Sequence, residues 1–193
     1  MSTKISSGIS YSTNYYLRDF YSNNRDAFKS TKRNDFSHME LVYEDSLALK
    51  KASHKLINRR DSYNNDTSTS DNKETDENTI NTIKAYVDVY NNAIDSSKDS
   101  DKMKRYAKQL KKLSSQYAEE LEDIGITTEA DGKLKINDNL LKTAGSEKVD
   151  KVFGKDIGYT KKIRMITRNM NNAAFDDLYS SITGNGTKIN LSL

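Results

Sequence analysis

The sequence predicts a mainly α-helical, elongated antiparallel bundle, coiled-coil-like in its packing, with one small β-hairpin near residues 125–137. Apolar residues recur at three- and four-residue steps through much of the chain. No proline interrupts the 193 residues, which favours long helices. Only 34% of the residues are hydrophobic and the mean hydropathy is −0.88. Long helices with narrow apolar stripes suit so lean a core better than a compact α/β enzyme does.

The domain organisation is expected to be simple. Residues 1–36 form an N-terminal arm with a short helix, residues 37–183 a single helical domain, and residues 184–193 a loose tail. Within the arm, residues 13–29 show a helical pattern rich in aromatic side chains. Such side chains usually cover a core, yet they are also the best candidates for an intermolecular contact. The candidates are Tyr16, Leu17, Phe20 and Phe28.

The helical domain opens with a capping box, in which Ser37 and Glu40 satisfy each other's free backbone donors. This predicts a helix to about Asn58, with an apolar stripe from Val42 to Leu56. Residues 61–76 contain almost no apolar side chain and are expected to form a flexible loop or linker.

A second helix is predicted from Glu77, with apolar residues at helical steps from Ile80 to Ile94. Ser100 can cap a third helix, whose apolar residues follow a nearly heptad rhythm as far as Ile124. A last helix repeats that rhythm after residue 158 and should end at Gly184. We expect these two helices to pack side by side. Their packing or assembly seam is Met103, Tyr106, Leu110, Leu113, Tyr117, Leu121, Tyr159, Ile163, Ile166 and Met170.

Residues 125–158 connect the two seam helices, and their first part predicts a hairpin. Gly125 ends the preceding helix in a left-handed conformation. Two short alternating stretches flank a three-residue loop that ends in Gly132. This register places Ile126 opposite Ile136 and Thr128 opposite Leu134. It also places Glu129 opposite Lys133 as a charge pair.

Two short helices are expected after the hairpin. Asn137 can cap the first, which carries Leu140 and Leu141 and stops at Gly145. Ser146 can cap the second, which stops at Gly154.

The order of these phrases resembles the C-terminal helical domain of the bacterial flagellar filament-cap protein, in the flagellar hook-associated family. The phrases are Gly-Ile, a polar run, Asp-Gly-Lys-Leu, Lys-Ile, a Leu-bearing helix, Val-x-x-Val-Phe-Gly, and Gly-Tyr before a long helix. Upstream, Ala85-Tyr86-Val87 with Tyr90-Asn91 is similar to the family's Phe-Val-x-x-Tyr-Asn helix. The resemblance covers roughly residues 80–170. The family's large β-rich outer domains have no room here, and its Gly-rich N-terminal motif is only hinted at by residues 6–9.

The resemblance implies a non-enzymatic structural protein that acts through protein–protein contacts in or alongside the flagellum. It implies flagellin or other flagellar axial proteins as partners, and assembly of several copies of the chain. It also implies an extracellular location, reached without a cleavable signal peptide. The sequence is consistent with this expectation in two respects. The first thirteen residues lack the apolar run of a secretory signal, and no apolar stretch is long enough to span a membrane.

No motif predicts catalysis, a cofactor or a metal site. Cysteine is absent, and His38 and His54 are 16 residues apart, on opposite sides of one predicted helix. The carboxylates Glu119, Glu120, Glu122 and Asp123 fit a polar helix end better than an acid–base pair. There is no glycine-rich phosphate loop. We therefore do not expect an enzyme.

Two alternatives remain open. The chain could be a cytoplasmic helical adaptor or chaperone that shares only the packing module with the cap family. It could also be a nucleic-acid-binding helical protein, because basic residues cluster at 102–112 and 161–168. The net charge of only +3 makes solvated helix faces the preferred interpretation of these clusters.

Overall fold

The computed structural model describes residues 36–58 and 75–184 of the chain. The chain divides into two units, Met1–Ser37 and His38–Leu193, and every element below belongs to the second. The described part is mainly helical with one antiparallel hairpin, which confirms the predicted fold class. In chain order the elements are α2 (His38–Ile57), α3 (Glu77–Ser96), the 3₁₀-helix η2 (Ser97–Asp99), α4 (Asp101–Gln116), α5 (Ala118–Glu122), β1 (Ile126–Thr128), β2 (Leu134–Ile136), α6 (Asp138–Thr143), α7 (Gly145–Phe153) and α8 (Gly158–Gly184).

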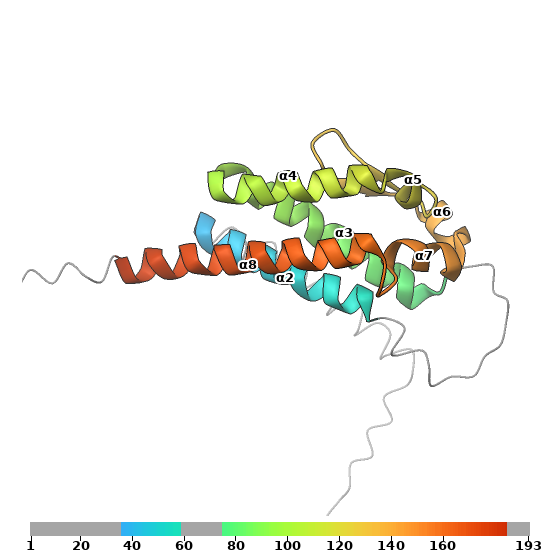
Figure 1. Ribbon diagram of the computed structural model, residues 1–193, viewed down its shortest axis with the longest axis horizontal. Coiled ribbons are helices and arrows are strands. Elements are labelled where there is room, and N and C mark those ends of the chain that lie inside the picture. Colours follow the sequence, from blue (N-terminus) through green and yellow to red (C-terminus); the bar gives the residue numbers. More distant parts are fainter. Residues whose placement is uncertain (1–35, 59–74, 185–193) are drawn as a thin grey trace, which may run out of the picture. The chain divides into compact units, whose positions relative to one another are not determined.

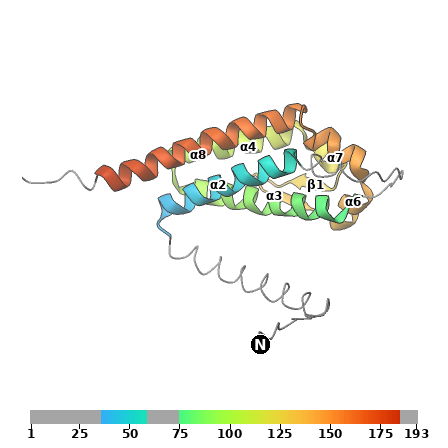
Figure 2. The same ribbon diagram turned by 90° about the horizontal axis from the view of Figure 1, so that it is seen from below.

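Helices α2, α3, α4 and α8 lie alongside one another as a bundle (Figures 1 and 2). Helix α8 packs against both α2 and α4, and α2 packs against α3. Side-chain contacts give the direction of the α2–α8 pair. The ring of Tyr43 lies 6.0 Å from that of Phe175, whereas Lys50, farther along α2, bonds Asn171, earlier in α8. These two helices are therefore antiparallel.

The two helices that carry the predicted seam, α4 and α8, are also antiparallel neighbours. Near the start of α4, the Nζ atom of Lys102 lies 2.5 Å from a carboxylate oxygen of Asp177, late in α8. Just beyond the end of α4, the ring of Tyr117 lies 5.4 Å from that of Tyr159, at the start of α8. The prediction that these helices pack side by side is correct.

Three helices begin at polar side chains that cap free backbone donors. Asp76 accepts a 2.9 Å hydrogen bond from the Thr79 N–H at the start of α3. Ser100 accepts one of 3.3 Å from the Met103 N–H at the start of α4. Asn137 accepts from the backbone of α6. The caps at Ser100 and Asn137 were expected from the sequence, and each fixes where its helix starts.

The hairpin has the predicted register, with Ile126 opposite Ile136 and Thr128 opposite Leu134. Gly125 and Gly132 hold the left-handed conformation at φ +77° and +95°. The expected charge pair of Lys133 with Glu129 is not the one that forms. The Lys133 ammonium instead lies 2.8 Å from a carboxylate oxygen of Asp95 in α3, because the hairpin packs with β2 against that helix.

Two expectations about helix boundaries are wrong. The third helix is not continuous to Ile124, because Tyr117 leaves the helical conformation at φ −116° and ψ 28° and separates α4 from α5. Ser146 is not a cap, because α7 begins one residue earlier, at Gly145 with φ +79°, and has no side-chain cap. Apolar spacing could not reveal the first break, since Leu113, Tyr117 and Leu121 keep their four-residue steps across it.

Candidate functional site

The structure places the predicted seam in the interior of the bundle. Nearly all of its side chains are buried, and Tyr117 is half-buried against the core. The seam therefore joins α4 and α8 within one chain and leaves no free apolar stripe there. The buried members are Met103, Tyr106, Leu110, Leu113, Leu121, Tyr159, Ile163, Ile166 and Met170. The predicted intermolecular candidates Tyr16, Leu17, Phe20 and Phe28 lie outside the described residues.

A cluster of aromatic rings forms the centre of the core. Tyr86 packs edge-on against Phe153 at 5.8 Å between ring centroids, and Phe153 packs against Tyr159 at 5.7 Å. Tyr90 lies 6.0 Å from Tyr86 along the same helix. Aromatic pairs at these spacings add to the stabilisation that burial provides. The cluster joins α3, α7 and α8, and Tyr117 extends it to the end of α4.

The hydroxyl groups of Tyr86, Tyr90 and Tyr159 all have hydrogen-bond partners. The Tyr86 and Tyr159 oxygens lie 3.0 Å apart, and the Tyr90 oxygen lies 3.1 Å from that of Ser114. Burial raises the pKa of Tyr86, Tyr90 and Tyr159 above the usual tyrosine value of 10.0. These phenols therefore stay protonated, and their role is to pair polar atoms inside an apolar core.

The side chain of Asn91 joins α3 to the hairpin. Its amide group donates to the backbone carbonyl of Leu134 and accepts from the backbone N–H of the same residue, both at 2.8 Å. A side-chain amide here takes the place of a neighbouring strand for one residue of β2. Sequence patterns gave no sign of this role, although Asn91 was among the residues that carry the family resemblance.

A second polar contact connects α2 and α8. Asn171 donates to the Ser46 hydroxyl at 3.2 Å and accepts from the Lys50 ammonium at 3.1 Å. Ser46 and Asn171 are buried, so the pair fixes the position of one helix along the other as well as satisfying its own polar atoms. The apolar periodicity did not reveal this contact, because both residues interrupt the stripe.

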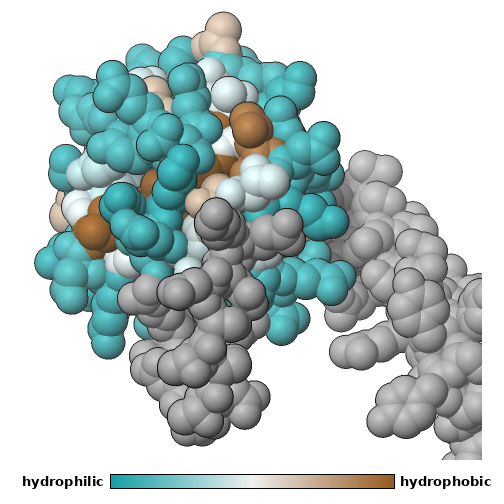
Figure 3. Space-filling model, turned by 90° about the vertical axis from the view of Figure 1, so that its right-hand side faces the viewer, coloured by the Kyte–Doolittle hydropathy of each residue, from teal (hydrophilic) through white to brown (hydrophobic). Residues whose placement is uncertain are grey.

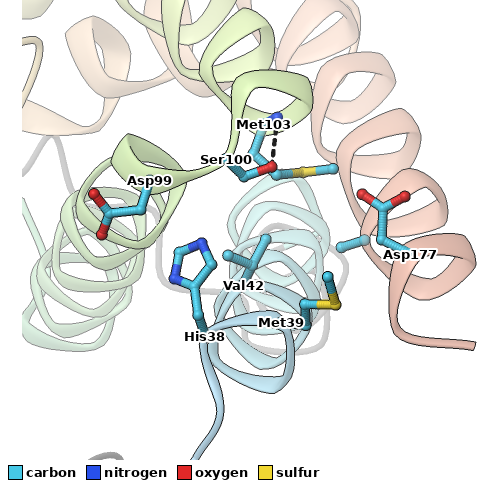
Figure 4. Close-up of a pocket in the computed structure, with 8 residues that line it drawn as sticks. His38, Met39, Val42, Asp99, Ser100, Met103 and Asp177 are labelled. Carbon is cyan, nitrogen blue, oxygen red and sulfur yellow. Dashed lines mark hydrogen bonds between the residues drawn. The ribbon is translucent and has the colours of Figure 1, made fainter. Parts of the chain in front are cut away.

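One end of the bundle has a small pocket of about 180 Å³. Its lining comes from the start of α2, the end of η2, the start of α4 and the late part of α8. The lining residues are His38, Met39, Val42, Asp99, Ser100, Met103, Ala174 and Asp177. Figure 4 shows the carboxylates of Asp99 and Asp177 on opposite sides of the pocket, with the imidazole of His38 between α2 and Asp99. The volume is below the roughly 300 Å³ at which small-molecule sites begin.

Three of the basic residues of α4 lie against acceptors of the same chain. Lys102 pairs with Asp177, and Lys104 pairs with Asp101 at 2.9 Å. Lys111 donates to the Ala130 carbonyl of the hairpin loop at 2.6 Å. These contacts hold the ammonium groups against the protein's own acceptors. The basic run 161–168 lies on α8, with Lys161, Lys162, Arg164 and Arg168 all exposed.

The remaining surface is mostly polar. Figure 3 looks onto the end of the bundle that α6 and α7 form, where the visible surface is largely hydrophilic with small hydrophobic areas. Among the described residues, the large apolar side chains that remain exposed are Met39, Leu140, Met165, Phe175 and Tyr179. Three of these, Met165, Phe175 and Tyr179, lie on α8, which makes this helix the most apolar exposed element of the bundle.

Within residues 36–58 and 75–184, no three His, Cys, Asp or Glu side chains gather in a way that could hold a metal ion. No helix in this part of the chain combines the length and the apolar character that crossing a membrane requires.

Comparison of the sequence with protein families, with curated proteins and with solved structures gave no significant match.

Proposed function

We propose that this chain is a non-enzymatic structural protein of the flagellar-cap class. It acts through protein–protein contacts, in or alongside the bacterial flagellum. Its expected partners are flagellin or other flagellar axial proteins, and several copies of the chain assemble together. The proposed location is extracellular, on the flagellum.

One observation supports this proposal most directly. The resemblance rests on two separate stretches, one around Tyr86 to Asn91 and the other from Gly125 to Tyr159, and these stretches are in contact. Asn91 bonds both backbone groups of Leu134, and Tyr86 packs on Phe153 and bonds Tyr159. Phrases that match by chance have no reason to meet. Residues that together build one packing module must lie in contact, and a family of proteins shares its packing modules.

A second observation supports action through contacts. The interior of the bundle is filled by aromatic and aliphatic side chains, and its buried tyrosines remain protonated. The pocket that opens at one end is small, with about 180 Å³. Both features fit a protein that acts through the outer faces of its helices.

The test is export in the organism that carries the chain. The full chain is followed by antibody in cells, in culture medium and in sheared filaments, with and without a working flagellar export system. We expect the chain in medium and filaments only when export works, with a cytoplasmic protein as the control for lysis. A chain that stays inside the cell in both strains would exclude the proposal and favour the cytoplasmic adaptor.

The nucleic-acid alternative has its own test. A titration of the purified chain with duplex DNA at low and at moderate salt measures whether affinity exists and falls with salt. The proposal expects no binding at low salt. Binding that weakens steeply with added salt would instead support the alternative, and the basic run on α8 would then be its first candidate site.

A further inference from the structure

The groove between α2 and α8 is lined by basic side chains beyond the polar contact that joins the two helices. Asn171 of α8 accepts from the ammonium of Lys50 in α2 at 3.1 Å. Arg168 and Arg164 precede Asn171 by three and seven residues, a spacing that keeps side chains on one side of a helix. Both arginines therefore lie on the flank of α8 that borders α2, and with Lys50 they form what we call the basic patch.

The chain does not neutralise the charge of the basic patch. Lys50, Arg164 and Arg168 are all exposed. Residues 46–57 of α2 and 158–175 of α8 contain no Asp or Glu. In the part of the chain that the structure describes, none of the three cations forms an ion pair. The patch therefore presents positive charge that is available to an outside partner.

A surface of the opposite charge lies at the end of α4. Glu119 and Glu122 belong to α5, Asp123 follows it directly, and all three carboxylates are exposed. They are three and four residues apart, so they share one side of the helix. Over the described ranges of the chain, these carboxylates form no ion pair either. We call these three residues the acidic cluster.

The two surfaces match in charge and in spacing. Arg164 and Arg168 are four residues apart, as are Glu119 and Asp123, so each pair spans about 6 Å along its helix. Guanidinium and carboxylate groups form strong, paired hydrogen bonds. Figure 1 shows α4 and α5 along one side of the bundle and α2 and α8 along the other. The two surfaces therefore do not meet within one chain, but they can meet between two copies.

We propose that the basic patch of one copy of this chain binds the acidic cluster of a second copy. The two halves of this contact are different surfaces, so each end of a pair keeps one of them free, and further copies can add head to tail. The inference deepens the proposed function, because it names the surfaces through which copies assemble. It rests on that proposal for the expectation of assembly, and purified protein tests it separately from export.

The contact should depend strongly on salt. Exposed ion pairs are individually weak and are screened by salt. We expect a dissociation constant on the order of 0.1 mM at about 20 mM salt, and at least about tenfold weaker association at about 300 mM salt. Light scattering and sedimentation of the full chain measure the average mass against concentration. A chain that stays monomeric at low salt up to about 1 mM, or an association that salt does not weaken, would overturn the proposal.

The two surfaces are tested by reversing the charge of one at a time. Arg164→Glu with Arg168→Glu makes the basic patch acidic, and Glu119→Lys with Glu122→Lys makes the acidic cluster basic. Each double variant sets like charges against each other and should raise the dissociation constant at low salt by about tenfold or more. Circular dichroism checks that each variant is folded. A folded variant that associates like the original chain would overturn the proposal.

The matched control reverses two charges on a different face. Lys108 and Lys112 of α4 are exposed and four residues apart, like the two arginines. Lys108→Glu with Lys112→Glu changes the net charge by the same amount as the arginine variant. The control should associate within about twofold of the original chain. A control that weakens as much as the arginine variant would mean that net charge, and not the basic patch, governs association.

A mixture of the two reversed variants gives the sharpest test. The acidic patch of one then meets the basic cluster of the other, and the unchanged surfaces also remain complementary. The mixture should associate within about threefold of the original chain, although neither variant does so alone. Two folded variants that do not associate when mixed would refute the contact. Duplex DNA that binds at low salt and is lost with Arg164→Glu and Arg168→Glu, without self-association of the chain, would assign the patch to nucleic acid and also overturn the proposal.

Discussion

Asn91 and Leu134, 43 residues apart in the chain, are joined by two hydrogen bonds of 2.8 Å, one in each direction between a side-chain amide and a backbone peptide unit. A two-stranded hairpin is marginal on its own in water. This contact gives the hairpin a third hydrogen-bonding neighbour, and it links α3 to the segment that connects the two seam helices.

Asn91→Ala is therefore expected to destabilise the bundle. The substitution removes both hydrogen bonds and leaves the N–H and C=O groups of Leu134, a buried residue, without their partner. We expect the free energy of unfolding to fall by about 2–3 kcal/mol, measured by urea denaturation. The control is Asn81→Ala on the same helix, where Asn81 is exposed and a change within about 0.5 kcal/mol is expected. Equal effects of the two changes would contradict the role of Asn91.

Gly125→Ala and Gly132→Ala test two glycines that share the left-handed conformation but differ in surroundings. A Cβ at Gly125 would lie 2.7 Å from the Cβ of Leu140 and 2.9 Å from the Asn137 carbonyl oxygen. At Gly132 its three nearest neighbours would be carbon atoms of the flexible Lys111 side chain, at 3.1–3.2 Å. We expect a loss of about 1 kcal/mol at Gly132 from backbone strain alone. At Gly125 we expect a loss of at least about 2 kcal/mol. Thermal and urea denaturation measure the difference, and a larger loss at Gly132 would contradict the packing described here.

Gly158 and Tyr117 offer a pair of substitutions in which the second change rescues the first. A Cβ at Gly158 would overlap the Tyr117 hydroxyl. The ring cannot swing away freely, because it packs edge-on against Tyr159. We expect Gly158→Ala to cost about 1–3 kcal/mol and Tyr117→Phe alone to cost under about 1 kcal/mol.

In the double variant the overlapping oxygen is gone, so most of the cost of Gly158→Ala should disappear. A double-mutant cycle by urea denaturation gives the coupling energy directly. Strictly additive costs would mean that Gly158 is required for a reason other than Tyr117.

Alkaline pH should unfold the protein, because it favours ionisation of the buried tyrosine hydroxyl groups. Burial raises the pKa of Tyr86, Tyr90 and Tyr159 in the folded state above the value of 10.0 that they take when exposed. The folded state therefore holds these protons more tightly. The stability that this contributes is fully present below pH 10.0 and is lost as the pH rises above it.

Tyrosinate absorbance and circular dichroism, followed together, check this expectation. We expect some of the twelve tyrosines of the chain to ionise only as helical structure is lost. Urea-unfolded protein is the control, in which all twelve should titrate together near their usual pKa. Complete ionisation of the folded protein near pH 10.0, with no loss of helix, would contradict the buried cluster.

The hairpin register was predictable because several independent signals agree on it. Ile126 and Ile136 must face the core, Gly132 closes a loop of fixed length, and a shift by one residue would expose both isoleucines. The cap at Ser100 was predictable for a similar local reason, since the acceptor and its donor are three residues apart.

The features that the sequence did not reveal depend on residues far apart in the chain. Asn91 meets Leu134, and Ser46 meets Asn171, only after the helices have packed. The break at Tyr117 was hidden because it preserves the apolar spacing on both sides.

Thr75 lies two residues before α3 and is hydrogen-bonded to the end of α6 and the start of α7. Its backbone N–H donates to the Lys142 carbonyl at 2.8 Å, and its buried hydroxyl accepts from the Gly145 N–H at 3.1 Å. The position of α3 is thus fixed by α6 and α7, independently of how much chain precedes it. A foreign domain inserted between Asn58 and Thr75 should therefore leave the bundle folded. The protein could then serve as a scaffold that displays the inserted domain.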